Sequence, residues 1–172
     1  MVAKIIDGRS VAAEVRRQVA EEAKLLWEQY GVRPGLAAIL VGNDPASEVY
    51  VGLKQKACEE AAFTFRKISL PGEVSEEDVI EYVHRLNMDD RIHGVIVQLP
   101  LPPHLNENRI IAALSPEKDV DGLHPVNMGR LLLGDENITP CTPTGIITLL
   151  EREEITLRGK HVVIVNRSKI VG

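Results

Sequence analysis

Two hydrophobic patterns alternate along this chain of 172 residues. Apolar side chains recur at helical spacing from Val11 to Leu26, with Ser10 placed to cap a helix and Gly31 placed to end it. The next apolar stretch, Leu36–Val41, has no polar member, which is typical of a strand covered on both faces in a parallel sheet. These segments predict a helix followed by a buried strand.

The same alternation continues through the rest of the chain. Acidic residues directly after Ser75 favour a helix start, because carboxylates are stabilised near the positive end of the helix dipole. We expect strands at 63–70, 93–98 and 161–165, and helices from 45 onward, at 75–86, at 106–114, in the tail of the loop 119–131, and at 142–152. This order predicts a doubly wound α/β fold with right-handed crossovers.

The end of the chain, V-V-I-V-N-R-S-K-I-V-G, is typical of the first strand and phosphate turn of a nucleotide-binding unit. A complete βαβ unit needs roughly 30 residues, and one strand with a turn cannot bury its own faces. We therefore expect a catalytic domain in residues 1–141. Residues 142–172 are expected to supply a linking helix and the start of a Rossmann-type domain that continues beyond Gly172.

Composition and charge narrow the possible partners. The net charge is −5, from 20 Lys and Arg against 25 Asp and Glu, and aromatic residues make up 3% of the chain. Nucleic-acid binding is not expected, since it relies on clustered cations and stacking aromatics. Without a signal-peptide pattern or an apolar run of roughly 20 residues, we expect a cytoplasmic protein that binds no membrane. Neither Cys58 and Cys141 nor the five histidines show metal-ligand spacing, so no metal is expected.

The segment after the strand 36–41 carries the first candidate chemistry. Asp44 can cap the helix that begins at Pro45, and Ser47, Tyr50 and Lys54 then share one helix face at i, i+3 and i+7. Ligands of open α/β sheets bind at the carboxyl ends of strands. Lys54 is either a solvated surface lysine or a functional amine, and periodicity alone does not decide between them.

Other polar residues have two interpretations each. Gln98 ends an apolar strand, so it is either a satisfied core amide or a group that reaches into a cleft. Asp119 and Asp121, in D-V-D-G, are typical turn formers. Arg167 and Ser168 follow a predicted strand and are either a solvated turn or a phosphate site.

Six motifs occur in order along the chain: I-I-D-G, V-G-N-D-P-A-S-E-V-Y-V-G-L-K-Q-K, H-G-V-I-V-Q-L-P-L-P, P-E-K-D-V-D-G-L-H-P-V-N-M-G-R-L, P-C-T-P-T-G and N-R-S-K-I-V-G. Together they resemble the bifunctional methylenetetrahydrofolate dehydrogenase/methenyltetrahydrofolate cyclohydrolase family over essentially the whole chain. The resemblance implies oxidation of 5,10-methylenetetrahydrofolate with NADP, or NAD, and then hydrolysis to 10-formyltetrahydrofolate in one folate cleft. It also implies a homodimer when the protein is full length.

The resemblance assigns roles to individual residues. Lys54 is the central catalytic residue, and Gln98 orients its amine. Tyr50 stacks on the folate rings, and Asp121 accepts hydrogen bonds from the edge of the pterin. The other implied substrate-binding residues are Ser47, Leu99, Pro100, Leu101, Pro102 and Cys141.

The implied cofactor residues are Asn166, Arg167, Ser168 and Ile170. The sequence departs from the family at Asn166, where the family has glycine, and the added bulk bears on the choice between NAD and NADP. A second departure is Ala62, again in place of a common glycine, where we expect only a small adjustment of the turn.

Two other functions remain open at this point. One is a non-redox folate-binding or dimerisation module that lacks its cofactor domain, and the other is a relative with dehydrogenase activity alone. Residues 1–172 by themselves are not expected to be competent as a dehydrogenase, because a dinucleotide must also be held at its pyrophosphate and ribose.

Overall fold

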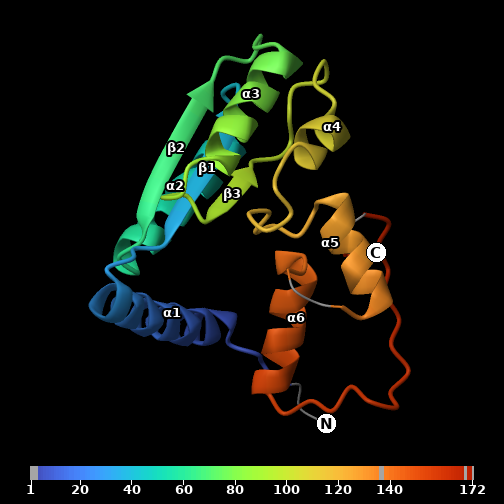
Figure 1. Cartoon of the computed structure of the whole chain (residues 1–172). Helices are drawn as coiled ribbons and strands as arrows, with labels where there is room; N and C mark the ends of the chain where they lie inside the picture. The colour runs from blue at the N-terminus through green and yellow to red at the C-terminus, as the bar shows by residue number, and fades with distance from the viewer. Residues whose placement is uncertain (1–3, 136–137, 169, 172) are drawn as a thin grey trace.

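The computed structural model describes residues 4–135, 138–168 and 170–171. These residues form a three-stranded parallel sheet with helices on both faces, which confirms the α/β fold class (Figure 1). The elements are α1 (Gly8–Tyr30), β1 (Gly35–Val41), α2 (Pro45–Glu60), β2 (Thr64–Leu70), α3 (Glu76–Asn87), β3 (Gly94–Val97), α4 (Glu107–Ala112), α5 (Pro125–Leu133) and α6 (Cys141–Arg152).

Strand β1 is the centre of the sheet, in the order β2-β1-β3. Ala37 and Ile39 belong to a buried cluster with Val79 of α3, whereas Ala38 packs with Val51 of α2 on the opposite face. The continuous apolar run thus reflects a strand covered on both faces, as predicted. Full burial of a valine or isoleucine side chain such as Ile39, Val51 or Val79 contributes about 1.5–3 kcal/mol.

The register of the sheet places a loop against β3. Leu36 of β1 aligns with Phe65 of β2 and with Gly94 of β3. A Cβ atom on Gly94 would lie 2.5 Å from Cγ1 of Val120, so only glycine lets the loop around Val120 approach this closely. Asp119, in the same loop, forms a parallel bridge with β3.

Most predicted helix starts are confirmed. The side chains of Asp44, Ser75 and Asn106 each accept a hydrogen bond from the backbone N–H three residues later, which stabilises a helix by about 1 kcal/mol. The expected cap of the first helix was wrong. Asp7 caps α1, accepting from the N–H groups of Arg9 and Ser10, because its carboxylate reaches two unpaired donors one turn earlier.

Helix α1 ends where the sequence predicted, at Gly31, which has φ +65°. Its apolar stripe is less buried than helical spacing suggested, since Ala23 is the one α1 residue among the buried ones of the described chain. Figure 1 shows the reason: α1 lies beyond the amino-terminal end of the sheet and does not cover a face.

The strand expected at 161–165 is absent from the described chain. These residues have no regular secondary structure, and Val163 and Val165 are strongly exposed. The composition favours a strand, but β structure requires a neighbouring strand to satisfy backbone N–H and C=O groups. The sheet that the structure describes consists of β1, β2 and β3, and this segment pairs with none of them.

Candidate functional site

A hydrogen bond joins two of the predicted catalytic residues. Lys54, in the third turn of α2, donates from Nζ to Oε1 of Gln98 at 3.1 Å. The Gln98 amide is itself fixed, because its Nε2 donates to the carbonyl of Leu99 at 2.8 Å. This second bond determines which amide atom faces the lysine, so Gln98 presents an acceptor to the amine. Of the two interpretations of Gln98, its contact with Lys54 and its place in the lining of a cavity favour a group that reaches into a cleft.

A cavity of about 150 Å³ gathers much of the predicted site. It lies where the carboxyl end of β3 meets α2, the loop after residue 119 and the start of α6. The lining residues are Lys54, Val97, Gln98, Leu99, Asp121, Leu123, Cys141, Thr142 and Ile170. Leu123 and Thr142 were not predicted as site residues, although each lies within one of the six motifs.

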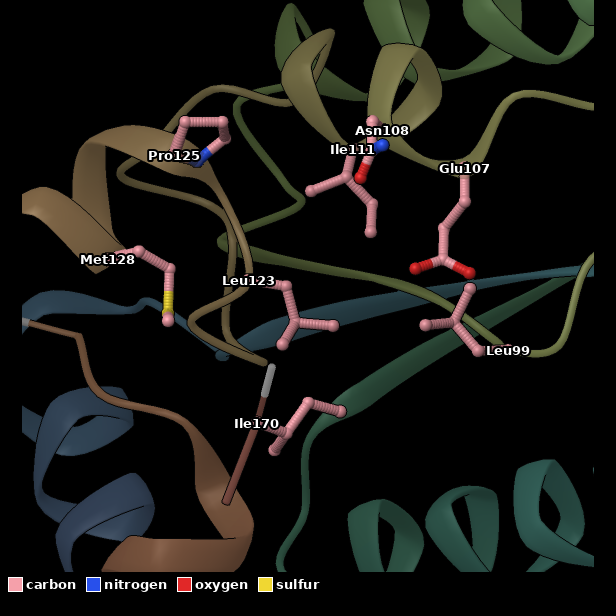
Figure 2. Close-up of a pocket in the computed structure, with 8 residues that line it drawn as sticks. All are labelled: Leu99, Glu107, Asn108, Ile111, Leu123, Pro125, Met128 and Ile170. Carbon is pink, nitrogen blue, oxygen red and sulfur yellow. The ribbon is translucent and has the colours of Figure 1, made fainter. Parts of the chain in front are cut away.

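A second cavity of about 460 Å³ adjoins the first, since Leu99, Leu123 and Ile170 line both. Figure 2 shows its walls, in which aliphatic side chains from α4, α5 and the loops face one another. Its other lining residues are Glu107, Asn108, Ile111, Pro125 and Met128. None of these five was predicted to line a site, because polar and apolar residues divided between α4 and α5 give no local signal of a shared cavity.

Gly122 brings the Asp121 loop and α6 together. It has φ +68°, and a Cβ there would lie 2.6 Å from the carbonyl carbon of Thr139 and 2.7 Å from the nitrogen of Pro140. This close approach places Cys141 beside the loop, where its thiol donates to the carbonyl of Val120 at 3.3 Å. The D-V-D-G and P-C-T-P motifs therefore form one wall of the small cavity.

The environment of this wall opposes negative charge. Burial raises the pKa of the Asp121 carboxyl, the Lys54 ammonium acts in the opposite direction, and the charge of Asp119 raises it further. Partial desolvation likewise raises the pKa of the Cys141 thiol, and the neighbouring Asp121 charge adds to that effect. A hydrogen-bond donor brought to Asp121 by a ligand would relieve part of this cost.

Asp119 does more than the turn former that its motif suggested. Its carbonyl accepts from the N–H of Gly122 at 3.2 Å, as in a turn. Its side chain, however, is buried, and Oδ2 accepts from the N–H of His124 at 2.7 Å and from Nδ2 of Asn127 at 2.9 Å. No local pattern distinguishes such a carboxylate from a solvated one.

Several predicted substrate residues lie outside the two cavities as the structure describes them. Tyr50 is 59% exposed on α2, and Ser47 is buried. Pro100, which follows a cis peptide bond, is exposed. Leu101 packs against the core cluster, and Pro102 is half-buried. Their roles toward a substrate stay predictions.

The four predicted cofactor residues separate into two groups. Asn166, Arg167 and Ser168 are exposed, and Oδ1 of Asn166 accepts from the N–H of Ser168 at 2.6 Å. The Ser168 hydroxyl oxygen accepts from the N–H of Val171 at 3.1 Å. Ile170 instead lines both cavities, so this segment links the predicted cofactor residues to the Lys54 site.

Sequence models of one family match both parts of the chain. The model described as tetrahydrofolate dehydrogenase/cyclohydrolase, catalytic domain, matches residues 6–121. The model described as the NAD(P)-binding domain of tetrahydrofolate dehydrogenase/cyclohydrolase matches residues 140–172.

Curated relatives carry the name bifunctional protein FolD. The protein from Bacillus cytotoxicus is 51% identical over 172 residues, which are 100% of this chain and 60% of that protein. The protein from Geotalea daltonii is 47% identical over 171 residues, which are 99% of this chain and 61% of that protein. The chain thus spans about 60% of the length of these relatives.

Solved structures agree with the sequence matches. The bifunctional FolD enzyme from Campylobacter jejuni has a TM-score of 0.95 at 40% identity, covering 98% of this chain and 60% of that one. The Trypanosoma brucei FolD, complexed with NADP cofactor and an inhibitor, has a TM-score of 0.94 at 40% identity, covering 99% and 58%. From its catalytic-domain match, its motifs and its fold, the chain belongs to the tetrahydrofolate dehydrogenase/cyclohydrolase family.

Proposed function

We propose that this chain forms the folate site of an enzyme that oxidises 5,10-methylenetetrahydrofolate and hydrolyses the methenyl product to 10-formyltetrahydrofolate. The observation that carries the proposal is the Lys54–Gln98 hydrogen bond, in a cavity that Asp121 also lines. An amine with a fixed acceptor and a desolvated carboxylate are the groups that such a reaction needs beside a bound pterin.

Lys54 moves protons in the hydrolysis. Water adds to the methenyl carbon and loses a proton to the Lys54 amine in its uncharged form. That proton is delivered to N5 as the bond between N5 and the former methenyl carbon breaks, and the remaining hydroxyl proton leaves to solvent as the 10-formyl carbonyl forms. Gln98 holds Nζ in one place because its own amide is tied to the Leu99 carbonyl. Positioning of this kind supplies much of the rate advantage in a site that forms no covalent intermediate.

Asp121 orients the substrate. The edge of a pterin presents parallel N–H donors, which suit the two oxygens of a carboxylate. Asp121 is partly dehydrated in the structure, so paired donors would replace the water that it has lost. Tyr50, exposed on the same helix as Lys54, would stack on the folate rings at the mouth of the site.

The dehydrogenase step depends on NADP, or NAD, which supplies the hydride acceptor when bound. Arg167 and Ser168 would hold a phosphate of this cofactor. Both are exposed, a guanidinium donates in a planar fork that matches phosphate, and the Ser168 hydroxyl keeps its own O–H to donate. The NADP complex of the Trypanosoma brucei relative supports this choice.

The bifunctional names of the relatives favour this function over a non-redox folate-binding module. A homodimer and a cytoplasmic location are parts of the proposal as well. In the part of the chain that the structure describes, no helix is both long and apolar enough to cross a lipid bilayer.

The test is the substitution Lys54→Met, measured by the conversion of 5,10-methenyl- to 10-formyltetrahydrofolate. We expect at least a roughly hundredfold loss of hydrolysis, while folate binding changes little, because the variant keeps the aliphatic stem but loses the proton carrier. Lys56→Met on the exposed side of α2 is the matched control and should behave as the unsubstituted protein. Full hydrolysis by Lys54→Met would refute the assignment.

A further inference from the structure

Asp119 holds both ends of the loop that contains Asp121. Its backbone carbonyl accepts from the N–H of Gly122 at 3.2 Å, one residue beyond Asp121. Its carboxylate accepts from the N–H of His124 at 2.7 Å, which fixes the residue where α5 is capped. Asp121 therefore lies within a segment that one buried side chain closes.

The Asp119 carboxylate is anchored in turn. Asn127, on the first turn of α5, donates from Nδ2 both to Oδ2 of Asp119 at 2.9 Å and to the carbonyl of Pro116 at 2.8 Å. Asp119 and Asn127 are each 1% exposed. A buried carboxylate that loses its N–H donors carries a large desolvation penalty in free energy. Movement of the loop would break these hydrogen bonds, so the network holds the loop in place.

We propose that Asp119 is a positioning residue: its carboxylate, hydrogen-bonded to His124 and Asn127, holds the Asp121 carboxylate in the cavity and places a second negative charge beside it. The inference rests on the proposed function, in which Asp121 receives the pterin donors. Asp119 itself does not line the cavity and is not expected to contact substrate.

The charge of Asp119 gives this role a signature that a purely structural residue lacks. Two charged groups act on Asp121, Lys54 from α2 and Asp119 from its own loop, and the Cys141 thiol of α6 lies 4.0 Å from its Oδ1. Like charges disfavour ionisation, so the charge of Asp119 raises the pKa of Asp121 beyond the effect of burial. Removing that charge while keeping the shape should lower the pH at which Asp121 loses its proton.

The experiment compares three variants of the chain. Asp119→Asn keeps an oxygen that can accept from His124 and Asn127 but removes the charge, whereas Asp119→Ala removes both. Asn87→Ala is the matched control, because Asn87 bonds the Ala113 carbonyl and the Ser115 N–H and thus tethers the segment that precedes the site. Two quantities are measured: the carbon-13 NMR titration of the Asp121 carboxyl in the free protein, and calorimetric binding of 5-formyltetrahydrofolate from about pH 4 to 8, a range that begins near the ordinary carboxyl pKa.

We expect the Asp121 titration midpoint to fall in Asp119→Asn and to stay unchanged in Asn87→Ala. Asp119→Ala should bind the folate at least about tenfold more weakly, because its loop is released. Near neutral pH, Asp119→Asn should bind the folate more tightly than Asp119→Ala and about as tightly as the unsubstituted chain. As the pH falls, it should lose folate binding at a lower pH than the unsubstituted chain does.

An unmoved Asp121 midpoint in Asp119→Asn would overturn the inference, as would unchanged folate binding by a folded Asp119→Ala. Should Asp119→Ala fail to fold, the Asn variant decides alone. If the unsubstituted chain binds no folate, the proposed function fails, and the titration in the free protein still decides whether Asp119 sets the charge of Asp121.

Discussion

Lys54 Nζ and Gln98 Oε1 lie 3.1 Å apart, although 44 positions separate the two residues in the chain. The bond spans α2 and the end of β3, which meet because β3 pairs directly with β1 and α2 follows β1. The amine is thus held by the topology of the sheet and not by its own helix alone. This relationship makes Gln98 the first residue to test after Lys54.

Gln98→Leu removes the acceptor for the Lys54 amine. We expect hydrolysis of 5,10-methenyltetrahydrofolate to fall by roughly tenfold to a hundredfold, because the amine no longer occupies one position relative to the substrate. Stability should change by only about 1 kcal/mol, since both side chains keep access to water. The matched control is Gln55→Leu, whose amide bonds Glu59 on the exposed side of α2. Equal activity of the two variants would contradict the role of Gln98.

Asp121→Asn should stabilise the fold at neutral pH while it weakens folate binding. Burial, aided by Asp119, raises the pKa of the Asp121 carboxyl above its ordinary value of 3.8. The folded state therefore holds the proton more tightly than the unfolded state does, and stability is lost as pH rises from the ordinary pKa through the raised one. The asparagine carries no charge and avoids this loss.

Urea unfolding of Asp121→Asn and of the unsubstituted chain at several pH values measures this difference. The variant should be more stable at pH 7, and its advantage should vanish below the ordinary carboxyl pKa of 3.8. Asp90→Asn, at an exposed aspartate, is the control. A variant that is less stable at every pH would show that the Asp121 charge is compensated in the fold.

Gly122→Ala should open the wall between Asp121 and Cys141. The left-handed conformation costs an alanine about 1–2 kcal/mol, and its Cβ would clash with the backbone of Thr139 and Pro140. We expect a loss of at least roughly 2 kcal/mol in thermal or urea unfolding, together with loss of folate binding. Gly52→Ala is an informative control, because its Cβ meets no atom within 4 Å and alanine favours the helix. The free energy of unfolding should therefore fall in Gly122→Ala and rise in Gly52→Ala.

Ala62→Gly should stabilise the chain. Ala62 adopts φ +59° directly after α2, where the N–H of Phe63 reaches back to the carbonyl of Cys58 at 2.8 Å. Glycine removes about 1–2 kcal/mol of steric cost from the folded state. It also raises the conformational entropy of the unfolded chain, which lowers the stability by up to about 1 kcal/mol. A net gain of roughly 0.5–1 kcal/mol in urea unfolding is expected. Ala61→Gly, at φ −90° and buried, should instead destabilise.

Local sequence signals account for most of the elements. Asp44 and Ser75 cap helices where their positions predicted, because a cap needs only its own side chain and the next three residues. The same logic failed at residues 161–165, where a β-branched run has no partner strand in the described chain. Helices satisfy their hydrogen bonds within one segment, whereas strands depend on another.

The sequence by itself determined the α/β class, the family and the identity of Lys54, Gln98 and Asp121 as candidates, since these follow from short motifs and hydrophobic period. The tertiary structure decided which candidates meet. It joined Lys54 to Gln98, left Tyr50 exposed, and buried Asp119, a residue that its motif presents as an ordinary turn former. Burial, and hydrogen bonds between residues far apart in the sequence, depend on how separate elements pack. A local sequence pattern does not specify which element a side chain will contact.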